Sequence, residues 1–415
     1  MQVAFYFDNS RLGNWRWADF LSGAVPMSGT DGQFLHLLAR MARRAGVTVA
    51  GYFKGGLPAL SPDYFEPVNG VSDAPGRARA TGAEIFLLNN FNEPREMASA
   101  IRACQAAGLP MIVWDQNGPY PELVDMLAQA EIVRRVVCVS KSQADGFRHH
   151  RLFRKVAVIY NALLSWENAA QTEPSDRCEN ICFLGATVAE KGLHHVARAW
   201  PEIKSARPDA TLTIIGSNRL YDRHCAVGPL GLAQRDFEEK FIGPFLGHDS
   251  ENARHRGVVI KGLMAPAAIR RLLREQQVVI VNPSVSRGGS FETFCVSAIE
   301  AQAEGCAVIG GRRLGLRETV IDGVTGSLIR HESRLAPALI ELLREPEKAR
   351  AMGRQAAAWV KNHFSVDQAD SQWTASFTGV KVGTPILPLP FSVQRATPKD
   401  YARLLFSSFR LGTYL

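Results

Sequence analysis

Short runs of apolar residues alternate with longer amphipathic stretches through most of the chain. Buried parallel strands read as short apolar runs, and the crossover helices between them read as amphipathic segments. In the first half, this pattern predicts strands at 3–7, 47–53, 84–88, 110–114, 135–140 and 155–160, with helices near 30–45, 93–107, 120–131 and 141–152. The first half is therefore predicted to form one doubly wound α/β sheet.

A polar stretch at 165–178 interrupts the alternation and is interpreted as a linker. Beyond it, strands are predicted at 181–185, 211–216, 257–261, 278–282, 306–310 and 326–329, with a helix at 346–363. The segment 217–256 is too long for a simple connection and is expected to carry helix of its own. We therefore predict an N-terminal domain over 1–164, a C-terminal domain over 179–364 and a tail over 365–415.

Composition narrows the class of protein. The 415 residues, 46% hydrophobic and 21% charged, fit two soluble domains with well-filled cores. Seven scattered cysteines suit a reducing compartment, and with no apolar run that spans a bilayer and no signal peptide we expect a cytoplasmic protein. The formal charge of +8 favours an anionic partner: a nucleotide, a phospholipid surface or nucleic acid.

Three loops with glycine follow predicted strands, at 27–32, 185–192 and 283–294. Ligands of open α/β sheets bind at the carboxyl ends of the strands, so Gly29, Gly185 and Lys191 are candidate contacts. In the third loop, Glu292 precedes a helix whose first N–H groups, at Phe294, Cys295 and Val296, would stabilise a diphosphate. Glu292 would then bind hydroxyls, and Glu300 would accept two hydrogen bonds from a diol. The alternative is that Ser297, Glu300 and Glu304 form an ordinary solvated stripe at helical spacing.

Two glutamates separated by seven residues, Glu292 and Glu300, are the hallmark of one enzyme family, and over roughly 28–363 the chain resembles the retaining GT-B glycosyltransferases, family 4 in particular. Supporting segments occur in the family's order at 139–140, 158–162, 183–185, 190–192, 214–216, 260–262, 282–284 and 322–326. The resemblance implies an α/β GT-B fold, in which two Rossmann-like domains face each other across a cleft and part of the tail returns to the N-domain.

The resemblance also implies roles for individual residues. Glu300 would bind the ribose of a nucleotide-diphosphate sugar, Glu292 the hydroxyls of the transferred hexose, and Lys191 the departing diphosphate. Backbone groups from Lys261 to Met264, including Gly262 and Leu263, would meet the base. Because Lys191 and the helix end supply positive charge, no metal and no cofactor is expected, and the sequence contains no Asp-X-Asp triplet.

The chain departs from the family pattern at several positions. Ala186 stands where an arginine usually binds phosphate; Arg287 is a candidate replacement, although an arginine in such a loop is often only solvated. Thr293 and Cys295 replace glycines between the two glutamates. Asp115 stands at the position of an N-domain histidine and is predicted to contact the sugar.

The expected reaction is front-face substitution with retention, which transfers a hexose to a hydroxyl of a glycan or lipid-linked acceptor in cell-surface polysaccharide or lipopolysaccharide synthesis. Basic segments at 148–155 and 11–17 mix cations with apolar rings, so they are either contacts to an anionic membrane surface or ordinary solvated faces. Nucleic acid is a poorer partner because no recognition motif accompanies the charge. The alternatives are a nucleotide-sugar epimerase and a noncatalytic nucleotide-sugar-binding subunit; a two-lobed exported binding protein fits least.

Overall fold

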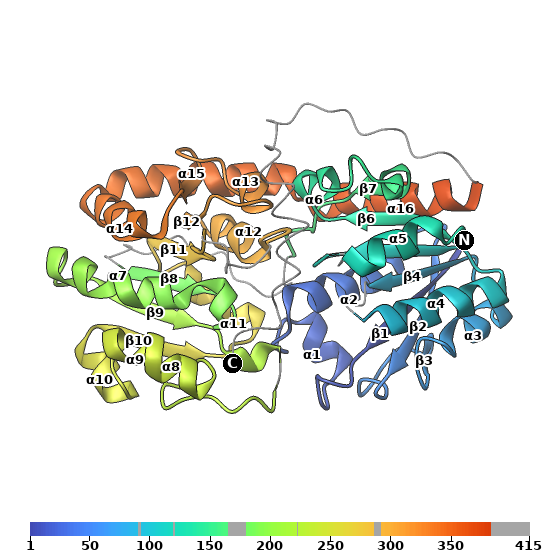
Figure 1. Cartoon of the computed structure of the whole chain (residues 1–415), viewed down its shortest axis with the longest axis horizontal. Coiled ribbons are helices and arrows are strands. Elements are labelled where there is room, and N and C mark those ends of the chain that lie inside the picture. Colours follow the sequence, from blue (N-terminus) through green and yellow to red (C-terminus); the bar gives the residue numbers. More distant parts are fainter. Residues whose placement is uncertain (90–92, 119–120, 165–179, 222, 286–291, 383–415) are drawn as a thin grey trace. The chain divides into compact units, whose positions relative to one another are not determined.

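The computed structural model describes residues 1–89, 93–118, 121–164, 180–221, 223–285 and 292–382. The chain forms two compact units (Figure 1). The first comprises Met1–Trp17, Thr30–Ala162 and Val366–Leu415, and the second comprises Ala18–Gly29 and Leu163–Ser365. The segment 18–29, which was predicted within the N-terminal domain, thus belongs to the second unit.

In the described residues, the first unit builds a seven-stranded parallel sheet in the order β3-β2-β1-β4-β5-β6-β7. The strands are β1 (Gln2–Asp8), β2 (Thr48–Lys54), β3 (Phe65–Pro67), β4 (Ile85–Asn89), β5 (Met111–Asp115), β6 (Val133–Cys138) and β7 (Val156–Val158). The helices are α2 (Gly29–Met41), α3 (Ala74–Ala80), α4 (Pro94–Ala107), α5 (Pro121–Gln129), α6 (Lys141–Asp145), the 3-10 helix η1 (Arg151–Lys155) and α16 (Val366–Val382), whereas α1 (Trp17–Leu21) lies almost wholly in the segment 18–29 of the second unit. This strand order, which reverses direction at β1, is that of a doubly wound sheet.

Helix α16 belongs to the first unit although it follows the whole second unit in sequence (Figure 1). Trp373 packs edge-on against Trp114 of β5, with 4.7 Å between the ring centroids. Arg135 of β6 donates to the carbonyl and the hydroxyl of Ser376, at 3.0 and 2.9 Å. These contacts bury the inner face of α16 on the sheet.

The described part of the second unit contains a six-stranded parallel sheet in the order β10-β9-β8-β11-β12-β13. The strands are β8 (Asn180–Leu184), β9 (Thr211–Ile215), β10 (Val258–Gly262), β11 (Val278–Val281), β12 (Ala307–Gly311) and β13 (Gly326–Ile329). The helical elements are η2 (Ala189–Lys191), α7 (Leu193–Ala206), η3 (Asn218–Leu220), α8 (Arg235–Phe241), α9 (Gly243–Leu246), α10 (Ser250–His255), α11 (Pro266–Leu273), α12 (Val296–Ala303), α13 (Leu316–Thr319), η4 (Glu332–Arg334), α14 (Leu335–Arg344) and α15 (Pro346–His363).

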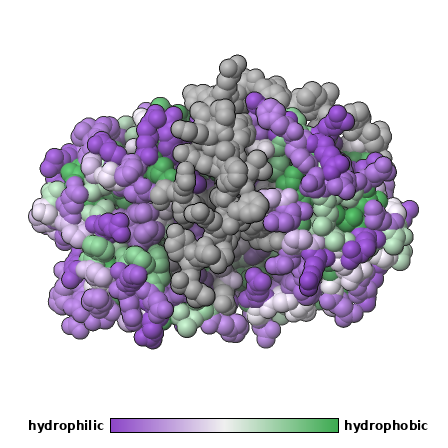
Figure 2. All heavy atoms as spheres, viewed as in Figure 1, coloured by the Kyte–Doolittle hydropathy of each residue, from purple (hydrophilic) through white to green (hydrophobic). Residues whose placement is uncertain are grey.

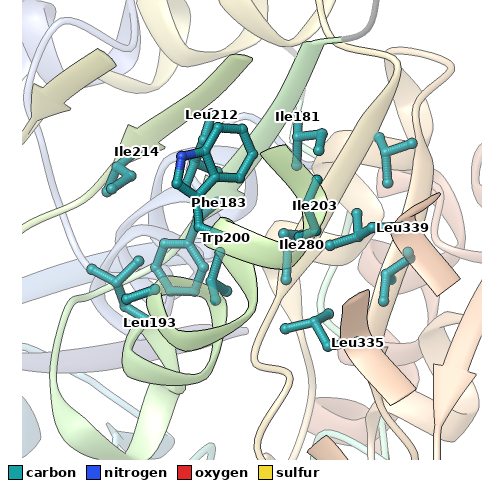
Figure 3. Close-up of a cluster of buried hydrophobic side chains, with 14 of the residues drawn as sticks. Ile181, Phe183, Leu193, Trp200, Ile203, Leu212, Ile214, Ile280, Leu335 and Leu339 are labelled. Carbon is teal, nitrogen blue, oxygen red and sulfur yellow. The ribbon is translucent and has the colours of Figure 1, made fainter. Parts of the chain in front are cut away.

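Apolar side chains cover both faces of the second sheet. On one face, Trp200 and Leu193 of α7 and Leu339 of α14 pack on strand residues such as Phe183 and Ile280 (Figure 3). On the other face, small residues of α12 pack on apolar residues of β8 and β11. Burying a large apolar side chain contributes about 1.5–3 kcal/mol, so these two layers fix the sheet and the loops at its carboxyl edge.

The predicted strands agree with the observed ones to within a few residues, but several predictions of helix were wrong or incomplete. The helix predicted over 141–152 ends at Asp145, next to Gly146, and η1 follows after His150, whose Nδ1 accepts a hydrogen bond from the Leu152 N–H at 3.1 Å. After Asp145 the chain continues in single turns, in which the Phe147 and Arg148 N–H groups donate to the carbonyls of Ala144 and Asp145. The pattern did not predict α1, α3, β3 or α16.

The surface is consistent with the composition. Within the described residues, no helix is both long and apolar enough to cross a membrane. The atoms visible on one face of both units are mainly hydrophilic, with apolar residues scattered among them (Figure 2). Six cysteines lie in the described part, and all six are buried thiols.

Candidate active site

The loops after β8 and β11 meet at the carboxyl edge of the second sheet, where these two strands are neighbours. Nζ of Lys191, at the end of η2, lies 2.7 Å from Oε2 of Glu292, although 101 residues separate them in sequence. Glu292 is only 7% exposed, whereas the Lys191 side chain is 22% exposed. Two predicted site residues therefore form an ion pair at the edge of the sheet.

Asn282 also binds the Glu292 carboxylate. Its Nδ2 donates to Oε2 of Glu292 at 2.8 Å, and its carbonyl accepts the Gly311 N–H at 3.0 Å. The backbone of Asn282 has φ of 36°, a left-handed conformation that asparagine tolerates better than most residues. A charged oxygen in a buried setting needs such donors, because an unpaired buried charge is strongly destabilising.

The electrostatics keep Lys191 positive. Burial alone would lower the pKa of Lys191, but the Glu292 carboxylate, with smaller contributions from Tyr221 and Cys295, raises it above its usual value. Burial, followed by the Glu292 charge, raises the pKa of Cys295 to about 12, so this thiol stays protonated at neutral pH. The site thus contains a permanent ammonium group and no thiolate at Cys295.

Close backbone contacts fix the two loops. Gly192, directly after Lys191, has φ of +78°, and a Cβ there would lie 2.5 Å from Oγ of Ser284 in the loop after β11. On the other side, the Gly315 N–H donates to the carbonyl of Glu292 at 2.9 Å. The described residues next to Lys191 and Glu292 therefore make close backbone contacts with neighbouring segments.

Helix α12 begins beside this ion pair. Its N-cap residue Cys295 is in an extended conformation, and its carbonyl accepts the Ala298 N–H at 3.2 Å. Phe294 and Cys295 are buried, and α12 starts at Val296, against which a Cβ at Gly29 would pack at 3.4 Å. The helix start carries a positive partial charge, which suits an anion.

Glu300 lies one turn into α12 and is half-buried. Burial raises its pKa to about 7, Arg270 of α11 opposes this shift, and Glu304 adds to it. Arg270 and Arg274 both bind Glu304, with Nε to carboxylate distances of 2.5 and 2.7 Å. The interpretation of Ser297, Glu300 and Glu304 as a solvated stripe is therefore wrong for Glu304, which is buried between two arginines.

The predicted contacts to a base lie at the end of β10, on the same carboxyl edge. Gly262 ends the strand, Leu263 follows it, and the Gly262 carbonyl accepts the Gly216 N–H at 2.8 Å. Gly185, directly after β8, lies close to this point, because a Cβ at Gly216 would come within 1.8 Å of the Gly185 carbonyl oxygen. The ends of β8, β9 and β10 are thus tightly joined.

Two further residues were predicted for the site, Arg287 and Asp115. Arg287 lies outside the described residues. Asp115 ends β5 of the first unit, where it is buried and accepts the Gly118 N–H at 2.9 Å. Burial raises its pKa to about 8, while bonds from Gly118 and Gln143 oppose the shift, so the carboxyl group is largely protonated at neutral pH. Its role toward the sugar stays a prediction.

Sequence reasoning gave no role to Asn282, which donates to Glu292, or to Arg270, which binds Glu304 near Glu300. Asn282 carried a signal, since it follows a predicted strand directly and precedes Pro283. Arg270 carried none, because it lies 34 residues from Glu304 and no local pattern links helices α11 and α12.

Comparison with known proteins agrees with this geometry. Residues 165–359 match the family model of glycosyl transferases group 1. A GDP-mannose-dependent alpha-(1-6)-phosphatidylinositol monomannoside mannosyltransferase of Mycolicibacterium smegmatis is 29% identical over 194 residues, 46% of this chain and 44% of that protein. A GDP-mannose-dependent monoacylated alpha-(1-6)-phosphatidylinositol monomannoside mannosyltransferase of Corynebacterium glutamicum is 31% identical over 195 residues, 46% of this chain and 45% of that protein. The chain spans about half the length of the curated relatives it matches.

Solved structures extend the likeness to both units. The structure of Anabaena HepE with UDP and glucose has a TM-score of 0.65 and 14% identity, and covers 91% of this chain and 100% of that one. Sucrose-phosphate synthase from Thermosynechococcus elongatus has a TM-score of 0.67 and 16% identity, and covers 92% and 100%. The predicted resemblance and the α/β GT-B fold are confirmed.

Proposed function

We propose that this chain, whose residues 165–359 carry a group 1 glycosyl transferase domain within a GT-B fold, transfers a hexosyl group from a nucleotide-diphosphate sugar to an acceptor hydroxyl. The observation that carries the proposal is the Lys191–Glu292 pair beside the start of α12. A cation, a hydroxyl-binding carboxylate and a helix N-terminus together match a sugar joined to a diphosphate.

Each group has one role in the proposed complex. The diphosphate lies against the start of α12, near Gly29 and Gly185, and takes Lys191 as its counterion. Glu292 then accepts hydrogen bonds from the hexose hydroxyls, still held by Asn282. Glu300 binds the ribose diol, the residues around Gly262 and Leu263 meet the base, and Asp115 donates a hydrogen bond to the transferred sugar.

The proposed chemistry is a front-face substitution that retains the anomeric configuration. The bond from the anomeric carbon to the diphosphate oxygen breaks, the acceptor oxygen bonds to the same face, and the acceptor proton passes to the departing diphosphate. Lys191 and α12 stabilise the charge that develops on the leaving group, so the reaction needs neither a metal nor a cofactor. The protonated Cys295 thiol is not needed as a nucleophile.

We propose a glycan or lipid-linked acceptor used in cell-surface polysaccharide or lipopolysaccharide synthesis, with the protein peripheral on the cytoplasmic face of a membrane. Two relatives are named for phosphatidylinositol mannosides, which supports a lipid-linked acceptor. Of the two basic segments, 148–155 is engaged within the unit: Lys155 donates to the carbonyls of Leu127 and Ala130, and Arg151 pairs with Asp125. This favours an ordinary solvated face for that segment.

The segment 11–17 differs from the prediction, because its rings point inward. Trp17 is buried and packs edge-on against Phe65, with 4.9 Å between the ring centroids. Two backbone hydrogen bonds, at 2.9 and 3.1 Å, join this segment to Ala59, whose neighbours Leu57 and Leu60 are 39% and 74% exposed. The proposed membrane contact therefore combines Arg11 and Arg16 with these leucines rather than with the tryptophans.

A screen of nucleotide sugars tests the proposed function. We expect one donor among GDP-mannose, UDP-glucose and the ADP and dTDP sugars to stabilise the protein by about 2.7 kcal/mol at a hundredfold its dissociation constant. With that donor and a panel of lipid-linked and free glycan acceptors, NMR of the product should give the donor's anomeric configuration. EDTA should leave the rate unchanged, and flotation with anionic vesicles should be weakened by Leu60→Ser.

The outcomes separate the alternatives. Conversion of the donor without an acceptor indicates an epimerase, and donor binding with no transfer across the panel indicates a binding subunit. A protein stabilised by none of these donors contradicts the proposal.

A further inference from the structure

The resemblance implies an arginine that binds the diphosphate beside Lys191. Ala186 occupies that position, and its buried methyl side chain cannot bind phosphate. Lys191 alone supplies too little positive charge for a diphosphate, since the carboxylate of Glu292 already offsets the charge of Lys191. The loop after β9 is the neighbouring source of charge. Its first residue, Gly216, approaches the Gly185 carbonyl so closely that a Cβ there would lie 1.8 Å from the oxygen.

This neighbouring loop reaches the ion pair. Tyr221, which is exposed, follows η3 and lies close enough to Lys191 to interact with it electrostatically. Two residues further along, the half-buried guanidinium group of Arg223 donates from Nη2 to the carbonyl of Pro26 at 2.6 Å. Arg223 therefore lies two positions after Tyr221, the residue of this loop that interacts with Lys191.

The Pro26 segment in turn borders the start of α12. Gly29, three residues after Pro26, packs against Val296, the first residue of that helix. Arg223 therefore links the loop beside Lys191 to the loop beside the helix start. These are the two sides on which the proposed function places the diphosphate.

The guanidinium group retains unused donors. Nε of Arg223 is buried and has no hydrogen-bond partner among the described residues. A buried donor without a partner is unfavourable, and a guanidinium group presents five N–H donors in a planar fork that suits phosphate oxygens. A single bond to Pro26 leaves most of that fork available to an anion.

We infer that Arg223 is the second cation that binds the diphosphate, in place of the arginine absent at Ala186. The inference rests on the proposed function, because it assigns a further residue to the same donor site. Arg223 contributes both positive charge and directed N–H groups, and a lysine at this position would replace only the charge.

Arg219 provides a matched control in the same loop. It is exposed, and its Nε donates to the Cys225 carbonyl at 3.3 Å. Removing either arginine changes the net charge equally, so a general electrostatic effect would appear in both variants. A specific phosphate contact would appear only in Arg223→Ala.

The experiment compares calorimetric affinities for a nucleoside diphosphate and for the nucleoside with the same base. With Arg223→Ala, we expect the diphosphate to bind about tenfold or more weakly, as expected for a lost charge-assisted contact, and the nucleoside to bind within about twofold of wild type. Arg219→Ala should bind both ligands within about threefold of wild type, and Arg223→Lys should fall between Arg223→Ala and wild type.

Thermal unfolding without ligand distinguishes a merely structural role. If Arg223→Ala weakens both ligands equally and lowers the unfolding temperature, Arg223 only tethers the loop to Pro26 and the inference is wrong. Unchanged affinity for the diphosphate also overturns it. A wild-type protein that binds no nucleoside diphosphate contradicts the proposed function itself, which is a separate result from a binding wild type with an unaffected variant.

Discussion

The ammonium nitrogen of Lys191 lies 2.7 Å from Oε2 of Glu292, and the same oxygen accepts a hydrogen bond from Asn282. Glu292 is nearly buried and Lys191 is partly exposed, so removing one partner has a different consequence from removing the other. Loss of the lysine leaves a buried carboxylate with an amide as its main donor, whereas loss of the glutamate leaves an ammonium group that reaches solvent.

A double-mutant cycle measures this coupling. We expect Lys191→Ala and Glu292→Ala each to lower the free energy of unfolding by about 1–3 kcal/mol, less than for a fully buried pair because Lys191 is partly exposed. The double variant should lose less than the sum, with a coupling of about 1–2 kcal/mol by chemical denaturation. Effects that add within about 0.5 kcal/mol would mean that solvent screens the pair.

Both single variants should also separate binding from turnover. Lys191→Ala removes the counterion of the leaving group, so the rate of transfer should fall further than nucleotide affinity. Glu292→Ala should reduce transfer while leaving affinity for the nucleoside diphosphate nearly unchanged, because Glu292 is proposed to contact only the hexose. Steady-state kinetics beside calorimetry checks this division.

A carboxylate at position 282 tests how strongly a second negative charge near Glu292 destabilises the fold. Asn282→Asp keeps the side-chain size and tolerates the same left-handed backbone, but it places a second negative charge against Glu292. We expect the variant to be about 1–3 kcal/mol less stable than wild type at pH 7, with the difference shrinking below pH 5 as one carboxyl group takes a proton. A difference that does not vary with pH would indicate backbone strain instead.

Asp115 gives a prediction of pH dependence in the first unit. Burial raises its pKa from 3.8 to about 8, so the folded protein binds this proton more tightly than the unfolded chain. Its contribution to stability is complete below the unfolded pKa and is lost progressively up to the folded pKa, by about 1.4 kcal/mol per pH unit. Asp115→Asn cannot ionise and keeps an oxygen for the Gly118 N–H.

Relative to wild type, Asp115→Asn should therefore gain stability steadily as the pH rises from about 5 to 8. Denaturation curves at a series of pH values measure the gain. A constant difference between the two proteins across this range would contradict the raised pKa.

The strands could be predicted from the sequence because their signals are local. Runs such as Val278 to Val281 are short and wholly apolar, as strands buried on both faces must be. Glu292 and Glu300 were found through a motif whose spacing is fixed by one loop and one helix, and Lys191 was found through the resemblance of the segment 190–192. The ion pair between Lys191 and Glu292 was not predicted, because the two residues lie 101 positions apart.

The parts that sequence reasoning missed depend on contacts between distant segments. The resemblance implied that part of the tail returns to the N-terminal domain, but helix α16 itself was not predicted, since it is held by Trp373 against Trp114 and by Arg40 against Asp370, partners that lie far apart in the chain. The aromatic segment 11–17 was misjudged for the same reason, because nothing local to Trp17 reveals the Phe65 ring that covers it. Propensity and periodicity describe one element at a time, and tertiary packing decides which side chains remain exposed.

The ionisation of Glu300 should control nucleotide affinity. Its pKa is raised to about 7, chiefly by burial, so about half of the free protein carries a protonated Glu300 at that pH. Only the ionised carboxylate accepts both hydrogen bonds from a ribose diol. Between pH 8 and 6 the ionised fraction falls about tenfold, and affinity for a nucleoside diphosphate should fall by the same factor.

Glu300→Gln separates this effect from titration of the phosphates, since it removes the carboxyl group and leaves the ligand unchanged. The ratio of wild-type to variant affinity should fall about tenfold from pH 8 to pH 6. Glu304→Gln should move the wild-type profile to lower pH, because the Glu304 charge helps to raise the pKa of Glu300. A ratio that stays constant with pH would mean that Glu300 does not bind the ribose as a carboxylate.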